Sequence, residues 1–492
     1  MADRGWATAA ACAAILSVLP LVGAGSWADA AQSDGRGGVS VPTPGCLPRA
    51  TPVPSGPATL VSRTTVPGTG GRVLDIVLNS PAMGDQQHVY VLLPMHFDAS
   101  GATRYPVLYL LHGAGGSYSD WVRMGVQKDV DYTTIADHLV PFITVMPNGG
   151  AWGFYTDWYG SDLDQRVSGP PPAWTTYHID ELIPWVDRNL PVVTGRGGRA
   201  IAGLSMGGFG AMSYAARYPD LFSAAGSFSG VTDTDIDFPV GGEALNLFSP
   251  AFTHGPPSQC IWGDTLTQGV RWHAEDPTYL AENLSGLSLF VASGNGHAGP
   301  YDKAGQSATE VTGVVESFIY AMNQGFASAL ASNGIPFTEY FYGAGTHSWG
   351  YWLRDLAHFL PQMSSVFSLS AIAASSGPFN FRTVDTAFET HGYHFSIQHV
   401  AEAFTYVRGV RPGGFTVVGT GTLTVETPPQ YVPGAVYRVT TAAASVLLRA
   451  DPEGKLAFTV GLGAPTMVQQ ADFTGTDPQA FPSSVVSIRP EG

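Results

Sequence analysis

One stretch, residues 201–212, constrains the fold of this chain more than any other. Small apolar residues run into a G-x-S-x-G sequence centred on Ser205, and a helix-like segment follows and ends before Pro219. A strand, a sharp turn and a helix are the context in which this motif forms a nucleophile elbow. In such a turn the Ser205 hydroxyl projects from the top of a sheet. The N–H of Met206 lies at a helix N-terminus, where developing negative charge is stabilised.

The motif needs support from the rest of the chain, because a sequence with 60 glycines in 492 residues can produce it by chance. Apolar runs predict buried strands on both sides of it, and helical spacing fills the segments between them. This alternation predicts an α/β fold, a mostly parallel sheet with helices on both faces, and places catalytic groups at the carboxyl ends of the strands. Strands are expected at 72–78, 88–93, 105–111, 142–147, 224–230, 287–294 and 337–342, and helices at 177–190, 211–217, 314–327 and from 351 to 359.

The charge balance excludes several classes of function. The formal net charge is −16 and the isoelectric point is near 5.1, which argues against binding to nucleic acid or adhesion to anionic lipid. At the N-terminus, Arg4 precedes a mostly apolar stretch at 9–22 and an A-x-A site at 28–30. We therefore expect a signal peptide over residues 1–30, cleavage near Ala30 and a secreted or cell-envelope protein. An uncleaved membrane anchor is the alternative.

Cysteine use agrees with export. Cys12 leaves with the signal peptide, and Cys46 and Cys260 remain as an even pair in an oxidising compartment. A disulfide between them is expected, with two free thiols as the alternative. No Cys/His cluster has zinc spacing, so we expect no metal and no cofactor.

Composition divides the rest of the chain. Residues 31–66 are rich in Pro, Gly, Ser and Thr and are expected to form an N-terminal arm, and the catalytic domain is expected at 67–370. Within it, 231–275 interrupts the alternation and predicts a cap-like insertion. A linker is expected at 371–378, followed at 379–492 by a β-rich domain whose short alternating strands indicate a sandwich. Its histidines, His391, His394 and His399, fit solvated strand positions better than a metal site.

The elbow and the strand–helix alternation together predict the α/β-hydrolase fold for the catalytic domain. A serine nucleophile needs a base and an acid, and the α/β-hydrolase fold places them in the order Ser, acid, His. His347 follows the last predicted core strand in a Gly-rich loop, which favours it as the base. Asp302 follows the penultimate strand, the usual position of the acid, so spacing favours it over Glu316 on the next helix and over Glu310. The other histidines considered as bases are His254, His273, His297 and His358.

Two further stretches suggest the surroundings of Ser205. The loop from His112 to Gly116 follows a buried strand, and α/β-hydrolases place their second oxyanion N–H in this loop. The run at 154–159 is rich in aromatic residues and fits either the core or the wall of an apolar cleft. The candidate substrate contacts are His112, Phe154, Trp158 and Trp349.

Several local sequences together resemble a known family. They are Val145-Met146-Pro147 with 154–159, the elbow at 203–206, Ile261-Trp262-Gly263 with Glu275-Asp276-Pro277, and 345–349 with Tyr351-Trp352. Over roughly residues 70–363 the chain resembles the serine esterase family that includes the antigen 85 mycolyltransferases, feruloyl esterases and S-formylglutathione hydrolase. The C-terminal segment resembles no family that we recognise.

The resemblance bears on individual residues. In the mycolyltransferases the acid is a glutamate on a helix, in a context that Val315-Glu316-Ser317-Phe318 matches, so the resemblance implies Glu316 as the acid and leaves Asp302 as the fallback. It implies the N–H groups of Ala114 and Met206 as oxyanion donors. An aspartate and an arginine that help those enzymes bind trehalose correspond to His112 and Gly115, which is closer to the feruloyl esterase pattern.

These observations predict a secreted serine esterase or acyltransferase that forms an acyl-enzyme on lipid or sugar esters. Water or a sugar hydroxyl accepts the acyl group, and mycolyltransferase-like transfer to a sugar is one alternative. Expected partners are the ester substrate and a sugar acceptor or cell-envelope glycan, with no nucleic acid and no integral membrane partner. The alternative from another class is a non-catalytic envelope- or matrix-binding protein built on a hydrolase scaffold.

Overall fold

The structure is a computed structural model, and it describes residues 46–162, 170–234, 258–265, 267–303, 310–368, 377–398, 400–467, 469–470 and 481–491. The expected signal peptide lies outside the described residues, as do most of the expected arm, part of the cap-like insertion and most of the linker. His254 and His399 also lie outside them.

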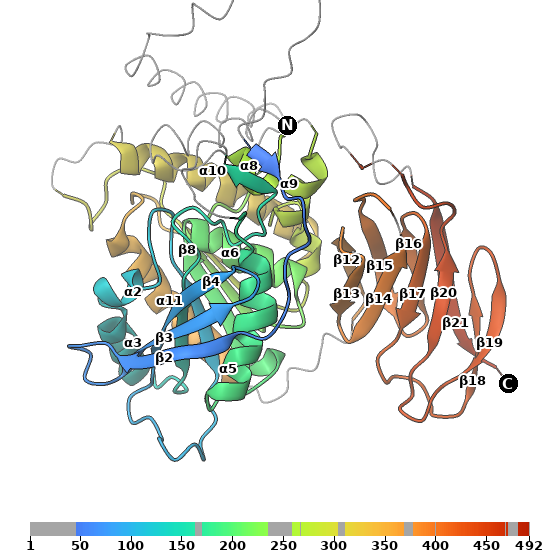
Figure 1. The fold of residues 1–492 in the computed structure, drawn as a ribbon, viewed down its shortest axis with the longest axis horizontal. Coiled ribbons are helices and arrows are strands. Elements are labelled where there is room, and N and C mark those ends of the chain that lie inside the picture. Colours follow the sequence, from blue (N-terminus) through green and yellow to red (C-terminus); the bar gives the residue numbers. More distant parts are fainter. Residues whose placement is uncertain are drawn as a thin grey trace, which may run out of the picture.

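A nine-stranded sheet forms the centre of the larger domain (Figure 1). Its order is β11-β10-β9-β8-β5-β6-β4-β3-β2. The strands from β6 to β11 pair in parallel, whereas β4, β3 and β2 pair antiparallel at one edge. The strands are β2 (Thr59–Thr65), β3 (Val73–Ser80), β4 (Asp85–Leu92), β5 (Val107–Leu111), β6 (Ile143–Pro147), β8 (Arg199–Leu204), β9 (Ala224–Phe228), β10 (Ser288–Ser293) and β11 (Thr338–Phe341).

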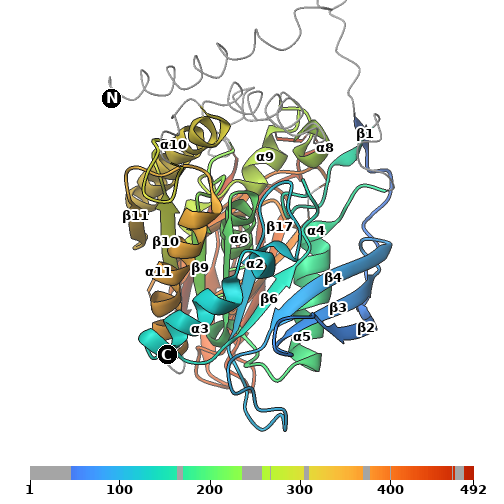
Figure 2. The ribbon, with the colours of Figure 1, turned by 90° about the vertical axis from the view of Figure 1, so that its left-hand side faces the viewer.

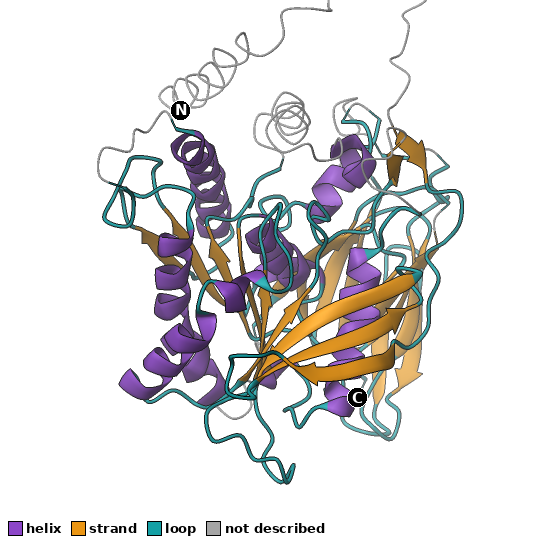
Figure 3. Ribbon diagram, turned by 60° about the vertical axis from the view of Figure 1, so that its left-hand side comes forward, coloured by secondary structure: helices purple, strands orange, loops and turns teal. Residues whose placement is uncertain are grey.

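Helices cover both faces of this sheet (Figures 2 and 3). One face packs on α2 (Asp120–Arg123), α3 (Val126–Ala136) and α11 (Trp349–Ser368). The other face packs on a second group of helices. These are α4 (Trp174–Thr176), η2 (Tyr177–Leu182), α5 (Ile183–Asn189), α6 (Met206–Arg217), η4 (Ala281–Leu284) and α10 (Val311–Ser332). A short η3 (Arg196–Gly198) leads into β8.

Alternation along the buried strands explains the two layers. Leu108 and Leu110 of β5 belong to the core under α11, whereas Tyr109 and Leu111 belong to the core under α6. Every residue of β5 is buried, as expected for a central strand covered on both faces. The three-layer α/β arrangement predicted from the sequence is confirmed.

A disulfide joins two distant parts of the larger domain. Cys46 bonds Cys260 with 5.2 Å between their Cα atoms. Cys46 opens β1 (Cys46–Pro48), which pairs with β7 (Gly160–Asp162), and Cys260 lies on α8 (Ser258–Trp262). Helix α9 (Gly269–Glu275) follows and buries Trp272 against Trp262. The expected bridge between Cys46 and Cys260 is therefore present in the structure.

The C-terminal domain consists of two sheets packed around their own core (Figure 1). The six-stranded sheet has the order β12-β15-β16-β21-β18-β19, and the four-stranded sheet has the order β13-β14-β17-β20. The strands are β12 (Phe379–Thr383), β13 (Ala387–Thr390), β14 (Tyr393–Gln398), β15 (Thr405–Arg411), β16 (Gly414–Val418), β17 (Thr422–Glu426), β18 (Val436–Thr440), β19 (Ser445–Arg449), β20 (Ala457–Gly461) and β21 (Ser483–Pro490).

Specific contacts dock this domain on the larger one. Arg382 forms an ion pair with Glu282, and its guanidinium lies over the rings of Tyr279 and Tyr406, 4.8 and 5.1 Å from their centroids. The side chain of Asn283 donates to the carbonyl of Arg382 and accepts from its N–H, both at 2.9 Å. The two domains therefore share a polar, partly buried interface.

Two segments differ from the sequence-based expectations. Strand β2 lies within 31–66, the range expected to be an arm, and it pairs with β3 as the exposed edge of the main sheet. The helix expected at 177–190 begins at Trp174 and passes through a π-helical stretch, η2.

Among the described residues, no helix has the length and apolar character needed to cross a bilayer.

Candidate active site

The turn at Ser205 joins β8 to α6 in a strained backbone conformation. Ser205 has φ 53° and ψ −120°, outside the regions that non-glycine residues favour. A Cβ on Gly203 would lie 2.4 Å from the carbonyl oxygen of Gly207, and one on Gly207 would lie 2.5 Å from that of Leu111. Both glycines of the motif are therefore required by close backbone approach. The turn leaves the Ser205 side chain partly accessible at the carboxyl end of β8.

Three side chains from separate elements form a continuous hydrogen-bonded series. Nε2 of His347 lies 2.9 Å from Oγ of Ser205, and Nδ1 of the same ring lies 2.7 Å from Oε2 of Glu316. His347 comes from the loop between β11 and α11, and Glu316 comes from α10. The structure thus brings together the serine, histidine and glutamate that the sequence nominated, which are separated by up to 142 positions.

Glu316 is fully buried and every partner around it donates a hydrogen bond. Its Oε1 accepts from the hydroxyl of Ser229 at 2.7 Å, from the hydroxyl of Ser293 at 3.0 Å and from the N–H of Gly294 at 2.7 Å. Its other oxygen faces His347. Partners on both oxygens fix the orientation of the carboxylate toward the imidazole.

The roles of Ser229 and Ser293 were missed in the sequence. Both stand at the carboxyl ends of parallel strands, β9 and β10, which is where functional groups gather in this fold. Ser229 also has a positive φ of 48°. A search for polar residues at strand ends would have identified both.

Asp302 holds the histidine loop and does not contact the histidine ring. Its carboxylate accepts hydrogen bonds from the hydroxyls of Thr346 and Tyr351 and from the N–H of Gly299. Burial alone raises the pKa of Asp302, but these three hydrogen bonds outweigh it and hold the pKa below its usual value. The fallback acid therefore fastens Thr346, the neighbour of His347, in place.

The remaining candidates lie away from Ser205 or make other contacts. His297 and Glu310 are exposed, and Glu310 lies at the start of α10. His358 on α11 pairs with the hydroxyl of Tyr340 at 2.9 Å. His273 is buried on α9 and stacks on Tyr279 with 4.3 Å between ring centroids. None of them has a hydrogen bond to Ser205 in the described part of the chain.

The loop after β5 packs directly on the nucleophile turn. A Cβ on Gly113 would lie 2.4 Å from the Leu204 side chain and 3.4 Å from Cβ of Ser205, so the loop and the turn are in close contact. The N–H of Gly115 donates to the carbonyl of Ala151 at 2.6 Å, which fixes the loop. The structure gives no protein acceptor for the N–H of Ala114 or Met206 within the described residues.

Three of the four residues expected to contact substrate are buried in the structure. His112 is 1% exposed; its Nδ1 lies 2.8 Å from the carbonyl of Gly113, and its Nε2 accepts the N–H of Gly149. Burial lowers the pKa of His112, so this ring stays neutral and braces two loops. Phe154 packs edge-on against Phe209 and Trp262, and the Trp158 indole donates to the carbonyl of Gly153.

The side chains of His112, Phe154 and Trp158 are therefore buried in the interior of the domain and are not exposed as substrate contacts. Trp349 is the exception. It is partly exposed at the start of α11, two residues from His347, and its ring meets Trp121 and Trp352 edge-on.

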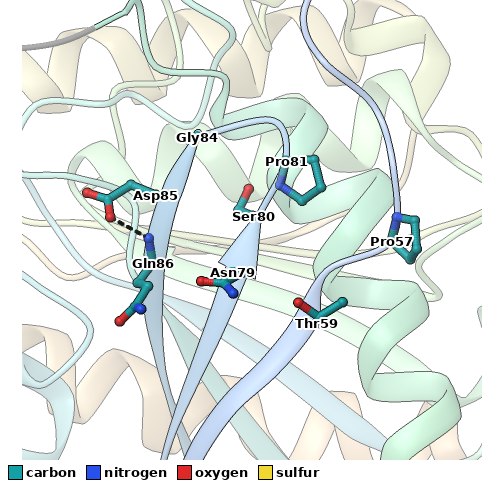
Figure 4. Close-up of a pocket in the computed structure, with 8 residues that line it drawn as sticks. All are labelled: Pro57, Thr59, Asn79, Ser80, Pro81, Gly84, Asp85 and Gln86. Carbon is teal, nitrogen blue, oxygen red and sulfur yellow. Dashed lines mark hydrogen bonds between the residues drawn. The ribbon is translucent and has the colours of Figure 1, made fainter.

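No cluster of three or more His, Cys, Asp or Glu side chains fit to hold a metal ion occurs in the described ranges. A surface hollow of about 410 Å³ opens at the edge formed by β2, β3 and β4 (Figure 4). It is lined by Pro57, Thr59, Asn79, Ser80, Pro81, Gly84, Asp85 and Gln86. None of these residues belongs to the series around Ser205.

The strand order, the strained serine turn and the histidine loop after the last strand define an α/β-hydrolase. The chain belongs to the Esterase family, whose model matches residues 80–363. That match ends just before the C-terminal domain, which lies outside it.

Individual relatives agree with this assignment. The chain is 33% identical over 281 residues to Esterase Rv1288 of Mycobacterium tuberculosis, covering 55% of this chain and 56% of that protein. It therefore spans about half the length of that relative. It is 29% identical over 301 residues to the diacylglycerol acyltransferase/mycolyltransferase Ag85B of Mycolicibacterium smegmatis, covering 59% of this chain and 84% of that protein.

Among solved structures, MPT51 (FbpC1) of Mycobacterium tuberculosis is similar with a TM-score of 0.47 and 24% identity. The similarity covers 62% of this chain and 99% of MPT51.

Proposed function

We propose that this protein is a secreted serine esterase or acyltransferase that acts on carboxylic esters through an acyl-enzyme. Ser205 is the nucleophile, His347 the general base and Glu316 the acid that orients it. The observation that carries the proposal is the unbroken series from the Ser205 hydroxyl through the imidazole to the buried carboxylate.

In the first half-reaction, Oγ of Ser205 attacks the ester carbonyl while Nε2 of His347 takes its proton. Glu316 stabilises the imidazolium that forms, because its second oxygen already accepts from Nδ1. Negative charge develops on the carbonyl oxygen, and we assign its stabilisation to the N–H groups of Ala114 and Met206. The alcohol leaves with the proton from His347, and the acyl group remains on Ser205.

In the second half-reaction, His347 removes a proton from the incoming acceptor, whose oxygen attacks the acyl-enzyme. The bond between the acyl carbon and Oγ of Ser205 then breaks, and His347 returns the proton to that Oγ. Water as acceptor releases a carboxylic acid, and a sugar hydroxyl gives a new ester. The two N–H groups support this scheme because Met206 adjoins Ser205 and Ala114 follows Gly113, which packs on Ser205. Neither N–H has a competing protein acceptor among the described residues.

Labelling with a fluorophosphonate probe tests the proposal. We expect the wild-type chain to be labelled, Ser205→Ala to lose all labelling, and Ser100→Ala, a substitution of an exposed serine, to be labelled like the wild type. An unlabelled wild type would overturn the enzyme proposal and favour the non-catalytic alternative, a binding protein on a hydrolase scaffold.

Acyl transfer to a sugar is the second candidate, supported by the similarity to Ag85B, a diacylglycerol acyltransferase/mycolyltransferase. His112 bears on it because its side chain is buried and occupied by two backbone groups. It cannot replace a carboxylate that contacts a sugar. We therefore expect hydrolysis to dominate. A panel of esters of increasing acyl length, assayed with and without trehalose or glucose, separates the two, since transfer produces an acylated sugar at the expense of free acid.

Export is part of the proposal, and it rests on the A-x-A site at 28–30 and on the disulfide between Cys46 and Cys260. Sequencing the N-terminus of the protein recovered from culture medium tests it. The expected first residue is Ala31, and a chain that begins at Met1 and stays with the cells would contradict cleavage.

A further inference from the structure

The two sheets of the C-terminal domain carry opposite charges. In the six-stranded sheet every charged residue is an arginine: Arg382, Arg408, Arg411, Arg438, Arg449 and Arg489. The strands of the four-stranded sheet carry two carboxylates, Glu389 and Glu426, and no arginine or lysine. Glu426 pairs with Lys455, which lies just before β20. This separation occurs in a protein whose net charge is −16.

The strand register places these arginines on one outer face. Val486 and Ile488 of β21 point into the core, so Val485, Ser487 and Arg489 point outward. Residues paired with these outward positions on the neighbouring strands also point outward, so they form rows across the sheet. These rows are Arg489–Arg438–Leu447, Arg411–Gly414–Ser487–Thr440–Ser445, Arg408–Thr416–Val485 and Val436–Arg449. Apart from Arg382, which is held in the domain interface, all of these arginines are exposed.

Arg438 and Arg489 stand directly opposite each other on β18 and β21. Like charges at facing positions destabilise an antiparallel pair, so folding alone does not favour this arrangement. Of the five exposed arginines, only Arg438 has a carboxylate partner among the described residues, and that partner is Glu491. For Arg408, Arg411, Arg449 and Arg489 the described residues provide no ion pair.

The contact with Glu491 shows which ligand chemistry suits this face. Nε of Arg438 donates to Oε2 at 2.8 Å, and its Nη2 donates to Oε1. This two-pronged contact is the geometry by which guanidinium groups recognise carboxylates. Hydroxyl groups of Thr416, Thr440 and Ser487 lie between the arginines and can bond neutral hydroxyl groups.

The face is also accessible. Strands β18, β19 and β21 lie on the side of the C-terminal domain away from the larger domain (Figure 1). Rows of guanidinium groups on strands about 4.8 Å apart form a flat, extended array rather than a pocket.

We propose that this outer face, defined by Arg408, Arg411, Arg438, Arg449 and Arg489, docks the protein on a carboxylate-bearing polysaccharide. A polymer with repeated carboxylates and free hydroxyls matches the alternation of arginine and hydroxyl side chains. A lipid surface fits less well, because the outward positions of β16, β18, β19 and β21 carry no aromatic side chain to enter a bilayer interface. The docking does not depend on the activity at Ser205.

Binding of the full-length protein to polygalacturonate tests the proposal, with neutral dextran and vesicles of equal parts phosphatidylglycerol and phosphatidylcholine as the other arms. We expect binding to polygalacturonate that weakens as salt rises, and none to dextran. The double variant Arg411→Gln/Arg489→Gln should bind about tenfold more weakly, because two guanidinium groups without an ion pair among the described residues are lost.

The matched control is Arg104→Gln/Arg188→Gln, which removes the same charge from exposed positions of the larger domain. It should bind like the wild type. Arg411→Lys/Arg489→Lys keeps the charge and loses the fork, so its affinity should fall between that of the wild type and that of the glutamine variant. Thermal unfolding of each variant establishes that it is folded. Failure of the wild type to bind polygalacturonate, equal loss in the control, or binding to the vesicles alone would each overturn the proposal.

Discussion

Glu316 and Asp302 are both carboxylates near the histidine, and they differ in what they hold. Glu316 accepts from the imidazole and from three donors behind it, whereas Asp302 accepts from the residues that flank the histidine loop. Spacing along the chain favours Asp302 as the acid, and only the local context around Glu316 favours the glutamate. Sequence reasoning needed the family resemblance at this point, because the contact depends on where α10 lies across the end of the sheet.

The first prediction separates these two roles. Glu316→Gln should lower kcat for a nitrophenyl ester roughly 10⁴-fold, because an amide cannot orient and stabilise the imidazolium as a carboxylate does. Asp302→Asn keeps an acceptor for Thr346 or Tyr351 and should lower kcat by only about tenfold, through a looser histidine loop. If Glu316→Gln retains nearly full turnover while Asp302→Asn does not, the assignment of the acid is reversed.

Two buried histidines give the fold a dependence on pH. Burial lowers the pKa of His112, and it lowers the pKa of His178 to about 3, against hydrogen bonds that raise it. The unfolded chain binds protons at these side chains near pH 6.5, whereas the native state does not. Their contribution to stability is therefore complete above pH 6.5 and is lost as the pH falls toward the native values.

Urea unfolding measured from pH 8 to pH 5 checks this second prediction. The free energy of unfolding should be steady above pH 7 and should fall below pH 6 by up to about 1.4 kcal/mol per pH unit for each histidine. His178→Gln should reduce that slope, because glutamine does not titrate. Equal slopes in the two proteins would show that His178 plays no part.

At the scale of the elements, the sequence predicted the buried parts of the sheet better than its edge. The apolar runs that form β5, β6, β8 and β10 are easy to recognise, because a strand covered on both faces consists mostly of apolar residues. Strand β2 has the sequence TLVSRTT and is mostly exposed. The position of β2 in the sheet depends on its pairing with β3, and no local sequence pattern predicts this pairing.

The elbow between β8 and α6 is the element most sensitive to one added methyl group. Gly203→Ala should abolish activity and lower the melting temperature, because its Cβ would lie 2.4 Å from a backbone oxygen of Gly207 and the backbone would have to move. Gly197→Ala is the matched control, since no atom lies within 4 Å of its added Cβ. Full esterase activity in Gly203→Ala would contradict the tight turn.

At the scale of the whole molecule, the sequence predicted two domains but gave no indication of how they meet. The residues that dock them, Glu282, Asn283 and Arg382, are ordinary polar residues in sequence. Phe404 and Tyr406 join the core of the larger domain although they belong to the C-terminal one. Complementarity between distant segments determines this interface, so local sequence patterns could not reveal it.

The fourth prediction concerns this docking. Arg382→Gln leaves Glu282 largely buried without its partner and should destabilise the docked state by about 3–5 kcal/mol. Scanning calorimetry should then show the C-terminal domain unfolding separately, at a lower temperature than in the wild type. Lys455→Gln removes an exposed ion pair with Glu426 and should leave stability nearly unchanged, because solvent screens such a pair. A single unchanged transition in Arg382→Gln would mean that other contacts hold the domains together.

The separation of charge between the two sheets of the C-terminal domain gives that domain an electric dipole across its thickness. With a net charge of −16, the whole protein is repelled by negative surfaces. We expect the dipole to orient the molecule so that the arginine-bearing sheet faces such a surface. Its retention on a cation-exchange resin should therefore exceed what its isoelectric point of about 5.1 suggests. Orientation of the molecule, rather than its total charge, then governs how it meets a charged matrix.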